Sequence, residues 1–458
     1  MSVPPRPLDE THDPRLRSWV ASANAPATDF PIQNLPFGAF RRHNSDDALH
    51  VGVAIGDQIL DFARCRDRQL FEGLPRPLRD ALDAPVLNPL MELGPAAMSQ
   101  LRARLMGILG SEGHGADASL LVPMAEAQLH LPVTVREYTD FYASIYHATN
   151  VGRLFRPDNP LFPNYKYVPI AYHGRSSSVV VGGTPIRRPC GQVKRSDSSE
   201  PVYQPAERLD YEVEIGTFIG GGSALGEPVP IADAERHLFG VCLLNDWSAR
   251  DLQSWEYQPL GPFLSKNFAT TVSPWVVTFE ALAPFRIPAF ARPPGDPKPL
   301  PHLDSKDNQA AGGVDIVIEA FLRSKQMRDQ KSDPLHLSTN RFREMYWTPA
   351  QMLTHHASNG CNLRTGDLLG SGTVSGPHDD ELGSLLELTR QGTTPLILPT
   401  GESRTFLADG DEVIFRGYCA RDGYARIGLG ECRGVVIPAQ NIDSVTSRLQ
   451  AQGLKPKT

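Results

Sequence analysis

Apolar and polar positions follow two different patterns along the chain. In the first part, HVGVAIGDQILDF (50–62) contains two apolar runs joined at Gly56-Asp57, a pair typical of a hairpin turn, and GPAAMSQLRARLMGIL (94–109) repeats apolar residues at helical spacing. From Leu131 onward, short runs such as SSVVVG, YEVEIGTFIG, VDIVIEAFL and DEVIFRGYC alternate with Gly, Pro and Asp turns. The pattern predicts a small α+β or barrel-like first domain and a β-rich second domain.

The boundaries follow from composition. The predicted division is an N-terminal arm at 1–30, a first domain at 31–128, a second domain at 129–445 and a C-terminal tail at 446–458. The Gly- and Ser-containing stretch 110–130 is predicted as a linker. Two Pro-rich segments, 188–205 and 281–301, are predicted as surface loops or lids, because proline cannot join the middle of a sheet.

Length, charge and cysteine usage narrow the class of protein. The 458 residues exceed what one core usually organises, and 40% apolar and 21% charged residues are typical of a globular protein. A net charge of -7 argues against a nucleic-acid or membrane-surface partner and leaves a small-molecule substrate. Six dispersed cysteines without a CxxC pair indicate reduced thiols. With no apolar segment of signal or membrane type in the sequence, we expect a cytoplasmic protein.

Four carboxylates in three separate segments are the strongest candidates for chemistry. They are Asp140 in YTDFY, Glu212 and Glu214 in YEVEI, and Asp246 in LLNDWSARD. A strand places Glu212 and Glu214 on one face, about 6.5 to 7 Å apart, where they repel unless a cation lies between them. With oxygen ligands and no nearby His or Cys at ligand spacing, a hard cation such as Mg²⁺ or Ca²⁺ is favoured.

Further polar residues lie close to these carboxylates in the sequence. Tyr142, His147 and Arg156 follow Asp140 and would suit an anionic, oxygen-rich substrate, although a lone histidine is more often a hydrogen-bonded structural residue. Glu387 stands among leucines in GSLLEL, which indicates either a wet strand face or a buried pair.

The segment 244–268 combines many polar groups with an apolar setting. A strand is expected to end at Asp246, and Ser248 and Asp251 form a capping-box pattern for the helix that follows. One face of that helix would carry, with Asp246, the side chains of Arg250, Gln253 and Tyr257, and Lys266 comes after a Gly-Pro turn. The alternative is a surface helix with solvated charges.

The segment 346–376 also carries a helix signature. Thr348 is predicted as N-cap and Pro349 as the first residue of a helix that stops near Gly360. A strand from Leu368 then places Thr373 at its end.

Several long strings resemble the fumarylacetoacetate hydrolase family: YTDFYASIYHATNVG, PNYKYVPIAYHGRSSS, GTPIRRPCGQ, NDWSARDLQSWEYQPLGPFLSKNF, LTHHASNGCNLRTGDLLGSGTVSG and FLADGDEVI. The resemblance implies a mainly β fold with α-helices (α+β), made of a small SH3-like N-terminal barrel and a larger mixed β-sandwich roll, in a homodimer. It also implies hydrolysis of a carbon–carbon bond in the diketo acid 4-fumarylacetoacetate, giving fumarate and acetoacetate, the last step of tyrosine and phenylalanine degradation.

The resemblance assigns roles to individual residues. It implies metal ligation by Asp140, Glu212, Glu214 and Asp246, with Lys266 and Thr270 near a second cation site. It implies His147 as base and Glu387 as its orienting acid, and an oxyanion-stabilising group of Arg250, Gln253 and Lys266. The implied substrate contacts are Tyr142, Arg156, Tyr172, Gln253, Tyr257 and Thr373. The departures from the family lie in loops, around 285–300 and 191–200.

Two other functions stay open at this stage. One is another diketo-acid hydrolase or decarboxylase of the same superfamily, such as an acylpyruvate hydrolase, which generally lacks this N-terminal domain. The other is a non-catalytic, metal-stabilised β protein, against which the presence of both His147 and Glu387 argues.

Overall fold

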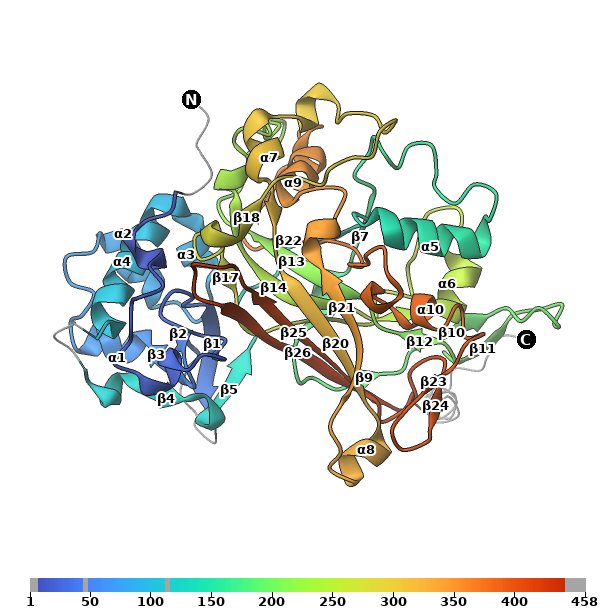
Figure 1. Ribbon diagram of the computed structural model, residues 1–458, viewed down its shortest axis with the longest axis horizontal. Helices are drawn as coiled ribbons and strands as arrows, with labels where there is room; N and C mark the ends of the chain where they lie inside the picture. Colours follow the sequence, from blue (N-terminus) through green and yellow to red (C-terminus); the bar gives the residue numbers. More distant parts are fainter. Residues whose placement is uncertain (1–6, 44–47, 112–115, 441–458) are drawn as a thin grey trace, which may run out of the picture.

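The computed structural model describes residues 7–43, 48–111 and 116–440 (Figure 1). Its N-terminal part is a five-stranded sheet in the order β4-β3-β2-β1-β5, covered by helices α1 to α4. The bounds are β1 Phe37–Arg42, β2 His50–Ile55, β3 Gln58–Asp61, β4 Leu121–Pro123, β5 Ala127–His130, α1 Phe62–Asp67, α2 Arg76–Leu82, α3 Asn88–Glu92 and α4 Gly94–Leu109. The predicted hairpin and the predicted helix at 94–109 are both confirmed, and Gly56 has the positive φ that its turn requires.

The predicted linker at 110–130 is wrong. Two parts of it form the strands β4 and β5, which pair with β3 and β1 and so complete the first sheet. Both strands are only three or four residues long, which explains why their sequence carried a weak periodicity. Residues 112–115 and the predicted tail at 446–458 lie outside the described residues.

An eight-stranded sheet forms the centre of the second part. Its order is β7-β6-β22-β13-β14-β16-β8, and β17 pairs with β14. The bounds are β6 Tyr138–Phe141, β7 Ala171–His173, β8 Val179–Val181, β13 Val213–Ile219, β14 Leu238–Asp246, β16 Thr270–Val272, β17 Val277–Thr278 and β22 Leu368–Gly370.

Both faces of this central sheet are buried. Val213 and Ile215 face a core shared with the third sheet, whereas Phe218 and Leu244 belong to a core shared with the N-terminal part. Backbone hydrogen bonds in both directions between Phe37 and Val276, at 2.8 and 2.9 Å, join the two parts directly. The N-terminal part therefore packs against one face of the central sheet and covers it.

The third sheet has the order β21-β20-β25-β26-β9 and crosses the front of the molecule in Figure 1. Its strands are β9 Ile186–Arg187, β20 Val317–Arg323, β21 Leu335–Arg341, β25 Glu412–Cys419 and β26 Ile427–Ile437. Short two-stranded ribbons are β10 Cys190–Val193 with β11 Val202–Pro205, β12 Leu209–Asp210 with β15 Ser248–Ala249, β18 Arg286–Ile287 with β19 Gly313–Val314, and β23 Leu396–Ile397 with β24 Ser403–Arg404. The second-part helices are α5 Ile145–Phe155, α6 Arg250–Glu256, α7 Lys306–Ala311, α8 Lys325–Asp329, α9 Pro349–Ala357 and α10 Leu385–Leu388.

Three local predictions have clear outcomes. The segment 188–205 contains the ribbon β10–β11 rather than being loop throughout, and Pro205 is tolerated at the end of its strand. The capping box at Ser248 and Asp251 is wrong, because Ser248 lies in β15 and Ala249 precedes α6 without a side-chain cap. Helix α9 begins after Thr348 with Pro349 in its first turn, as predicted.

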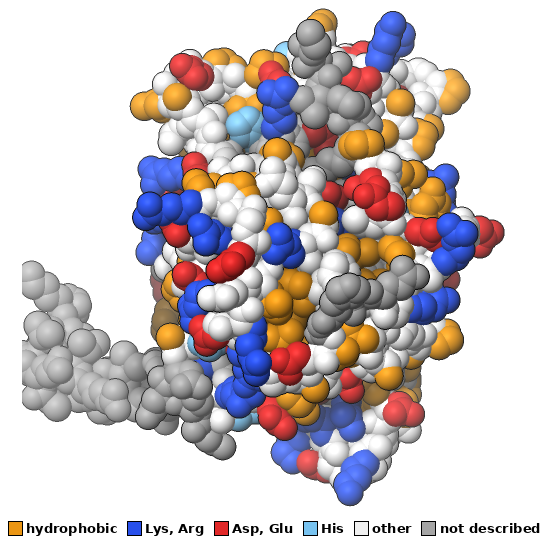
Figure 2. Space-filling view, turned by 90° about the vertical axis from the view of Figure 1, so that its left-hand side faces the viewer, with side chains coloured by type: hydrophobic (Ala, Val, Ile, Leu, Met, Phe, Trp, Pro, Cys, Tyr) orange, Lys and Arg blue, Asp and Glu red, His pale blue; other side chains and the backbone are white. Residues whose placement is uncertain are grey.

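The described structure is a mixed α and β fold dominated by sheets, and all six cysteines are free. Among the described helices, none combines the length and the apolar character that crossing a membrane would need. Figure 2 shows basic and acidic side chains interspersed on the face that the N-terminal part contributes.

Candidate metal and catalytic site

Neighbouring strands of the central sheet place the predicted site residues side by side. Across β7, β6 and β22, Tyr172 is opposite Asp140, and Asp140 is opposite Gly370. On the other side of β13, Asp246 is opposite Thr270 of β16. Residues that are far apart in the sequence therefore lie on neighbouring strands of one sheet.

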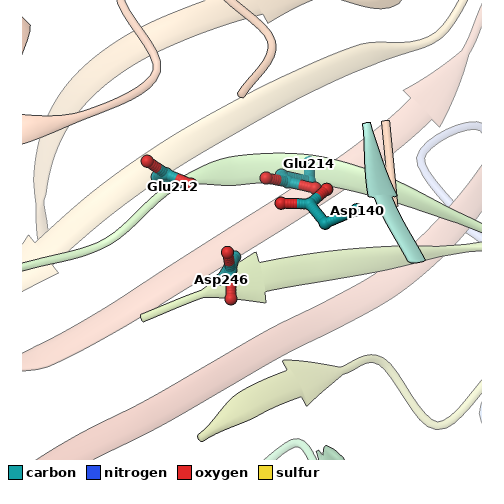
Figure 3. A group of neighbouring side chains, drawn as sticks. All are labelled: Asp140, Glu212, Glu214 and Asp246. Atoms are coloured by element: carbon teal, nitrogen blue, oxygen red, sulfur yellow. The ribbon is translucent and has the colours of Figure 1, made fainter. Parts of the chain in front are cut away.

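The four carboxylates form a compact group, which we call the cage (Figure 3). Each contributes an oxygen, and these atoms all lie within 4.8 Å of one another. Glu214 lies on β13 and Glu212 immediately precedes this strand, while Val213 and Ile215 point to the opposite, apolar face. The two-residue spacing thus places both glutamates on one face, as predicted.

Electrostatics in the cage disfavour four negative charges. Burial and then the charge of Asp246 raise the pKa of Asp140 well above its usual value. Burial, followed by the charges of Asp140 and Asp246, likewise raises the pKa of Glu214. Burial also raises the pKa of Asp246 in spite of the opposing ammonium of Lys266. Such a group holds all its charges when a cation is present between them.

Two buried cations neutralise one side of the cage. The Nζ of Lys266 contacts Glu212 Oε2 at 2.5 Å and Asp246 Oδ2 at 2.8 Å, and Arg250 Nη1 lies 2.8 Å from Glu212 Oε1. Burial would raise the pKa of Glu212, but the charges of Lys266, Arg250 and then His147 outweigh it and lower that pKa. Among the described residues, Asp140 and Glu214 are therefore the two cage carboxylates without an ion pair.

The donor set fits a hard divalent cation. Every cage ligand is a carboxylate oxygen, and Glu214 Oε1 is buried without a hydrogen-bond partner among the described residues. A Cβ at Gly370 would lie 2.5 Å from Asp140 Oδ1 and 3.0 Å from Glu214 Oε2, so only glycine leaves this space open. The backbone N–H of Gly372 donates to the same two oxygens, at 3.2 and 3.1 Å.

A histidine–glutamate pair lies beside the cage. Ser144 caps α5, which presents His147 in its first turn, and α10 presents Glu387. His147 Nδ1 and Glu387 Oε2 are 2.7 Å apart and both side chains are buried. Burial would raise the pKa of Glu387, but His147 and hydrogen bonds from its neighbours lower it overall. The glutamate is thus held as a carboxylate that can accept from Nδ1, and in the neutral tautomer with its hydrogen on Nδ1 an imidazole has Nε2 as its acceptor.

The remaining predicted residues divide into two groups. The ring of Tyr142 is 5.4 Å from that of His147, the Tyr172 hydroxyl donates to Asp246 at 2.7 Å, and Thr270 donates to Asp246 at 3.2 Å. Gln253 accepts from Arg250 Nη1 at 3.1 Å, and Thr373 Oγ1 is buried without a partner among the described residues.

Arg156 and Tyr257 lie outside this contact network. The Arg156 guanidinium stacks on Phe162, 4.1 Å from the ring centroid, and Tyr257 accepts from the neighbouring Gln258. Asp246 ends β14 and so does not share a helix with Gln253 and Tyr257, contrary to the single helix face expected from sequence.

A cavity of about 370 Å³ adjoins the cage. Tyr172, Lys266 and Thr270, three of the predicted residues, line it. The other lining residues are Tyr138, His173, Gly174, Arg175, Ser177, Pro262, Phe263 and Asn267. The cavity gives a small polar molecule a place next to Asp246 and its cationic neighbours.

Sequence reasoning missed the residues that hold the site together. Glu387 accepts from Asn150 at 2.9 Å, from Ser375 at 3.0 Å and from Ser384 at 2.9 Å. The N-cap position of Ser384, directly after the turn signal of Gly383, was the available clue in GSLLEL. Asp210 had no local signal of this kind, because its partners lie 40 and about 175 positions away.

The chain matches known proteins over most of its length. The family model for the C-terminal part of fumarylacetoacetate (FAA) hydrolases matches residues 137–437, and the fumarylacetoacetase N-terminal model matches residues 33–132. The chain is 50% identical to the fumarylacetoacetase of Homo sapiens and 49% identical to that of Rattus norvegicus, each over 420 residues covering 90% of this chain and 97% of the relative. It is 44% identical to that of Oryza sativa subsp. japonica over 433 residues, covering 93% and 98%.

Proposed function

The chain belongs to the fumarylacetoacetate hydrolase family, and from this we propose that it hydrolyses the carbon–carbon bond of 4-fumarylacetoacetate, giving fumarate and acetoacetate. Identity of 44–50% to curated fumarylacetoacetases over at least 90% of the chain supports this substrate. The observation that carries the mechanism is the buried His147–Glu387 pair next to the cage.

His147 is the general base. Glu387 accepts from Nδ1, so Nε2 is free to take a proton from a water molecule. The resulting hydroxide forms a bond to the attacked carbonyl carbon of the diketone. Because Glu387 is held ionised, it also stabilises the imidazolium that forms.

Buried donors stabilise the oxyanion that develops on the attacked carbonyl. Arg250 Nη2 and Thr373 Oγ1 are both buried without a partner among the described residues, which leaves them available to the substrate. Gln253 and Lys266 complete the cationic and polar side of this group, and Tyr142, Tyr172, Arg156 and Tyr257 hold the rest of the substrate. Such preorganised donors contribute several kcal/mol, about 3 to 4 for a single well-placed donor.

The cage would hold Mg²⁺ or Ca²⁺ through Asp140, Glu212, Glu214 and Asp246, supplying positive charge beside the two diketone oxygens. Lys266 and Thr270 contribute an ammonium and a hydroxyl at the Asp246 side. An ammonium supplies charge and donates hydrogen bonds rather than ligating a cation, so we assign Lys266 to charge balance there.

Collapse of the tetrahedral oxyanion breaks the carbon–carbon bond. The electron pair leaves with the acetoacetate carbon, where the neighbouring carbonyl group stabilises it as an enolate, and the imidazolium of His147 returns the proton to that carbon. The water molecule is thereby divided between the new carboxyl group of fumarate and the new C–H bond of acetoacetate.

One assay tests the activity. Purified protein is mixed with fumarylacetoacetate, with and without EDTA and with added Mg²⁺ or Ca²⁺, while loss of the diketone absorbance is followed and both products are identified. We expect cleavage that EDTA abolishes and the cation restores. Cleavage of acylpyruvates in its place would move the protein to another diketo-acid hydrolase of the superfamily.

The resemblance also predicts features at a larger scale. We propose that the protein is a homodimer, that its first sheet closes as an SH3-like barrel and that its second part is a β-sandwich roll; the cytoplasmic location expected from the sequence is a separate proposal. Sedimentation of the purified protein tests the first of these.

A further inference from the structure

Asp210, a residue with no role in the mechanism above, touches both halves of the site. Its side chain is fully buried and lies at the end of β12, two positions before Glu212. Each of its two oxygens accepts two hydrogen bonds. Oδ1 accepts from the backbone of Tyr211 at 2.8 Å and of Leu385 at 2.8 Å, and Oδ2 accepts from Leu386 at 3.0 Å and Arg250 Nε at 2.8 Å.

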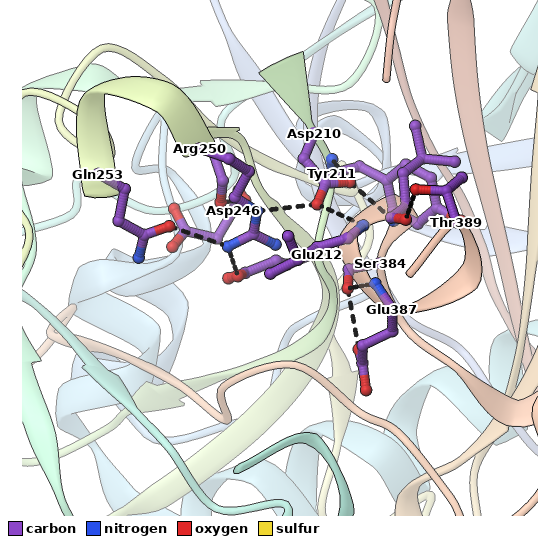
Figure 4. Close-up of polar contacts among 12 residues, drawn as sticks. Asp210, Tyr211, Glu212, Asp246, Arg250, Gln253, Ser384, Glu387 and Thr389 are labelled. Carbon is purple, nitrogen blue, oxygen red and sulfur yellow. Dashed lines mark hydrogen bonds and ion pairs between the residues drawn. The ribbon is translucent and has the colours of Figure 1, made fainter. Parts of the chain in front are cut away.

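On one side, Asp210 fixes the guanidinium that faces the substrate. With Nε bound to Asp210, the Nη1 of Arg250 reaches Glu212 and Gln253, as Figure 4 shows. The third nitrogen, Nη2, is then the one left without a partner. The direction of this proposed oxyanion donor is therefore set by Asp210.

On the other side, Asp210 fixes the helix that carries Glu387. Leu385 and Leu386 are the first two residues of α10, which has only four residues, and Glu387 is the third. A helix this short has little stability of its own, so the two bonds from its backbone to Asp210 anchor it. Ser384 holds the Glu387 side chain from the same turn (Figure 4).

We propose that Asp210 is a positioning residue that sets the distance between the oxyanion donor Arg250 and the base-orienting Glu387. This inference rests on the proposed function for the roles of those two residues. Its physical basis is that one rigid carboxylate, saturated by four hydrogen bonds, is the shared reference point for both. A displacement of either partner by about 1 Å would cost on the order of 100-fold in rate.

The chain offers a matched control. Asp411 is also fully buried, pairs with an arginine, Arg404, through Oδ2 at 2.8 Å and Oδ1 at 3.1 Å, and accepts from the backbone of Ala408 at 2.8 Å. Asp411 directly precedes β25 of the third sheet in the sequence. None of its hydrogen-bond partners named above belongs to the cage or to the His147–Glu387 pair. Asp411→Asn therefore removes a comparable buried network without touching the site.

The test compares Asp210→Asn with Asp411→Asn. Asparagine retains one acceptor oxygen and directs an amino group at donors, so we expect kcat to fall about 100-fold in Asp210→Asn with little change in KM, and Asp411→Asn to keep its kcat. Asp210→Glu keeps the charge but moves it by one methylene, and a kcat between those of Asp210→Asn and the wild type is expected. Asp210→Glu also decides the matter if Asp210→Asn does not fold.

A second readout needs no substrate. In ¹⁵N-labelled protein, the N–H signals of His147 Nδ1 and Arg250 Nε, assigned from His147→Ala and Arg250→Lys, report the two bonds that Asp210 aligns. We expect Asp210→Asn or Asp210→Glu to shift both signals and Asp411→Asn to leave them in place. Unchanged signals together with near wild-type kcat would overturn the proposal. If instead the wild type does not cleave fumarylacetoacetate, the proposed function fails while the two signals still decide the role of Asp210.

Discussion

Glu387 and Glu214 are both buried glutamates of one site, yet their surroundings are opposite. Glu387 receives hydrogen bonds from four side chains, and its pKa is lowered overall. Glu214 lies with the three other cage carboxylates, its Oε1 has no partner among the described residues, and its pKa is raised. The histidine–glutamate side is therefore complete within the chain itself, whereas the cage is a buried acidic group that could hold an added cation.

The largest expected loss of kcat comes from a substitution in the His147–Glu387 pair. In Glu387→Gln, an amide N–H₂ would face donors, so the tautomer of His147 is no longer fixed. We expect kcat to fall on the order of 10³-fold, within the range for an oriented general base. Because Glu387 is not a cage ligand, calorimetric titration should show unchanged Mg²⁺ or Ca²⁺ affinity.

The exposed neighbour Asp380 provides the control for this change, since Asp380→Asn removes the same charge outside the site. A Glu387→Gln variant with near wild-type turnover would contradict the role of the pair, and a large loss of metal affinity would contradict the division into two sides.

A second change acts on the cage without removing a ligand. In Gly370→Ala, the new methyl group would lie 2.5 Å from Asp140 Oδ1, so the carboxylates must move apart. We expect metal affinity to fall about 10- to 100-fold, as for changes next to metal ligands. Calorimetric titration of the divalent ion measures this.

Gly107→Ala is the matched control for that substitution. Gly107 lies in α4, and a Cβ there meets nothing within 4 Å. Alanine should raise stability by about 0.5 to 1 kcal/mol and leave metal binding alone. If Gly370→Ala and the wild type bound the divalent ion with equal affinity, the cage would have room for the added methyl group, and the prediction would be wrong.

A third change tests whether the ionised carboxylate of Glu214 destabilises the metal-free protein. Because the pKa of Glu214 is raised in the folded state, its contribution to stability is present at low pH and is lost as pH rises through the folded pKa. In EDTA at pH 8, Glu214→Gln should therefore raise the free energy of unfolding, by about 1 to 2 kcal/mol, and the gain should shrink toward acid pH. Urea unfolding at several pH values measures it.

Glu212→Gln makes the opposite prediction, because the pKa of Glu212 is lowered and its charge is already paired with Lys266 and Arg250. Neutralising it should destabilise the metal-free protein at pH 8. Two variants that shift stability in the same direction would refute this contrast.

The smallest loss of kcat is expected from removing one hydrogen bond to Glu387. Asn150→Ala removes the hydrogen bond to Glu387 Oε1 and leaves the three at Oε2. A loss of about 1 kcal/mol, or roughly fivefold in kcat, is expected. Thr149→Ala, which removes a bond to its own helix, serves as the neighbouring control.

Sequence reasoning reached the site residues by two routes of different strength. The two-residue period placed Glu212 and Glu214 on one face, because strand geometry alone determines this. The roles of His147 and Glu387 came from the family resemblance, since their contact joins residues 240 positions apart. Gly370 and Asp210 escaped both routes, because their importance depends on strand register and on backbone groups of α10.

The failed predictions have a related cause. Ser248 and Asp251 match a capping box locally, but pairing of Ser248 with Asp210 in the ribbon β12–β15 takes precedence over the cap. In the same way, the short strands β4 and β5 exist because β3 and β1 provide partners for them. Local patterns are overruled where a distant strand satisfies the backbone.

The pairing of Phe37 with Val276 has a practical consequence for dividing this protein into pieces. A fragment lacking the first 132 residues would leave Phe218, Phe239 and Leu244 uncovered on the very sheet that carries the cage. Loss of activity in such a fragment would report aggregation through that bare surface and say nothing about catalysis by the N-terminal part. Inherited or engineered substitutions around Phe37 should accordingly act as folding defects of the whole enzyme.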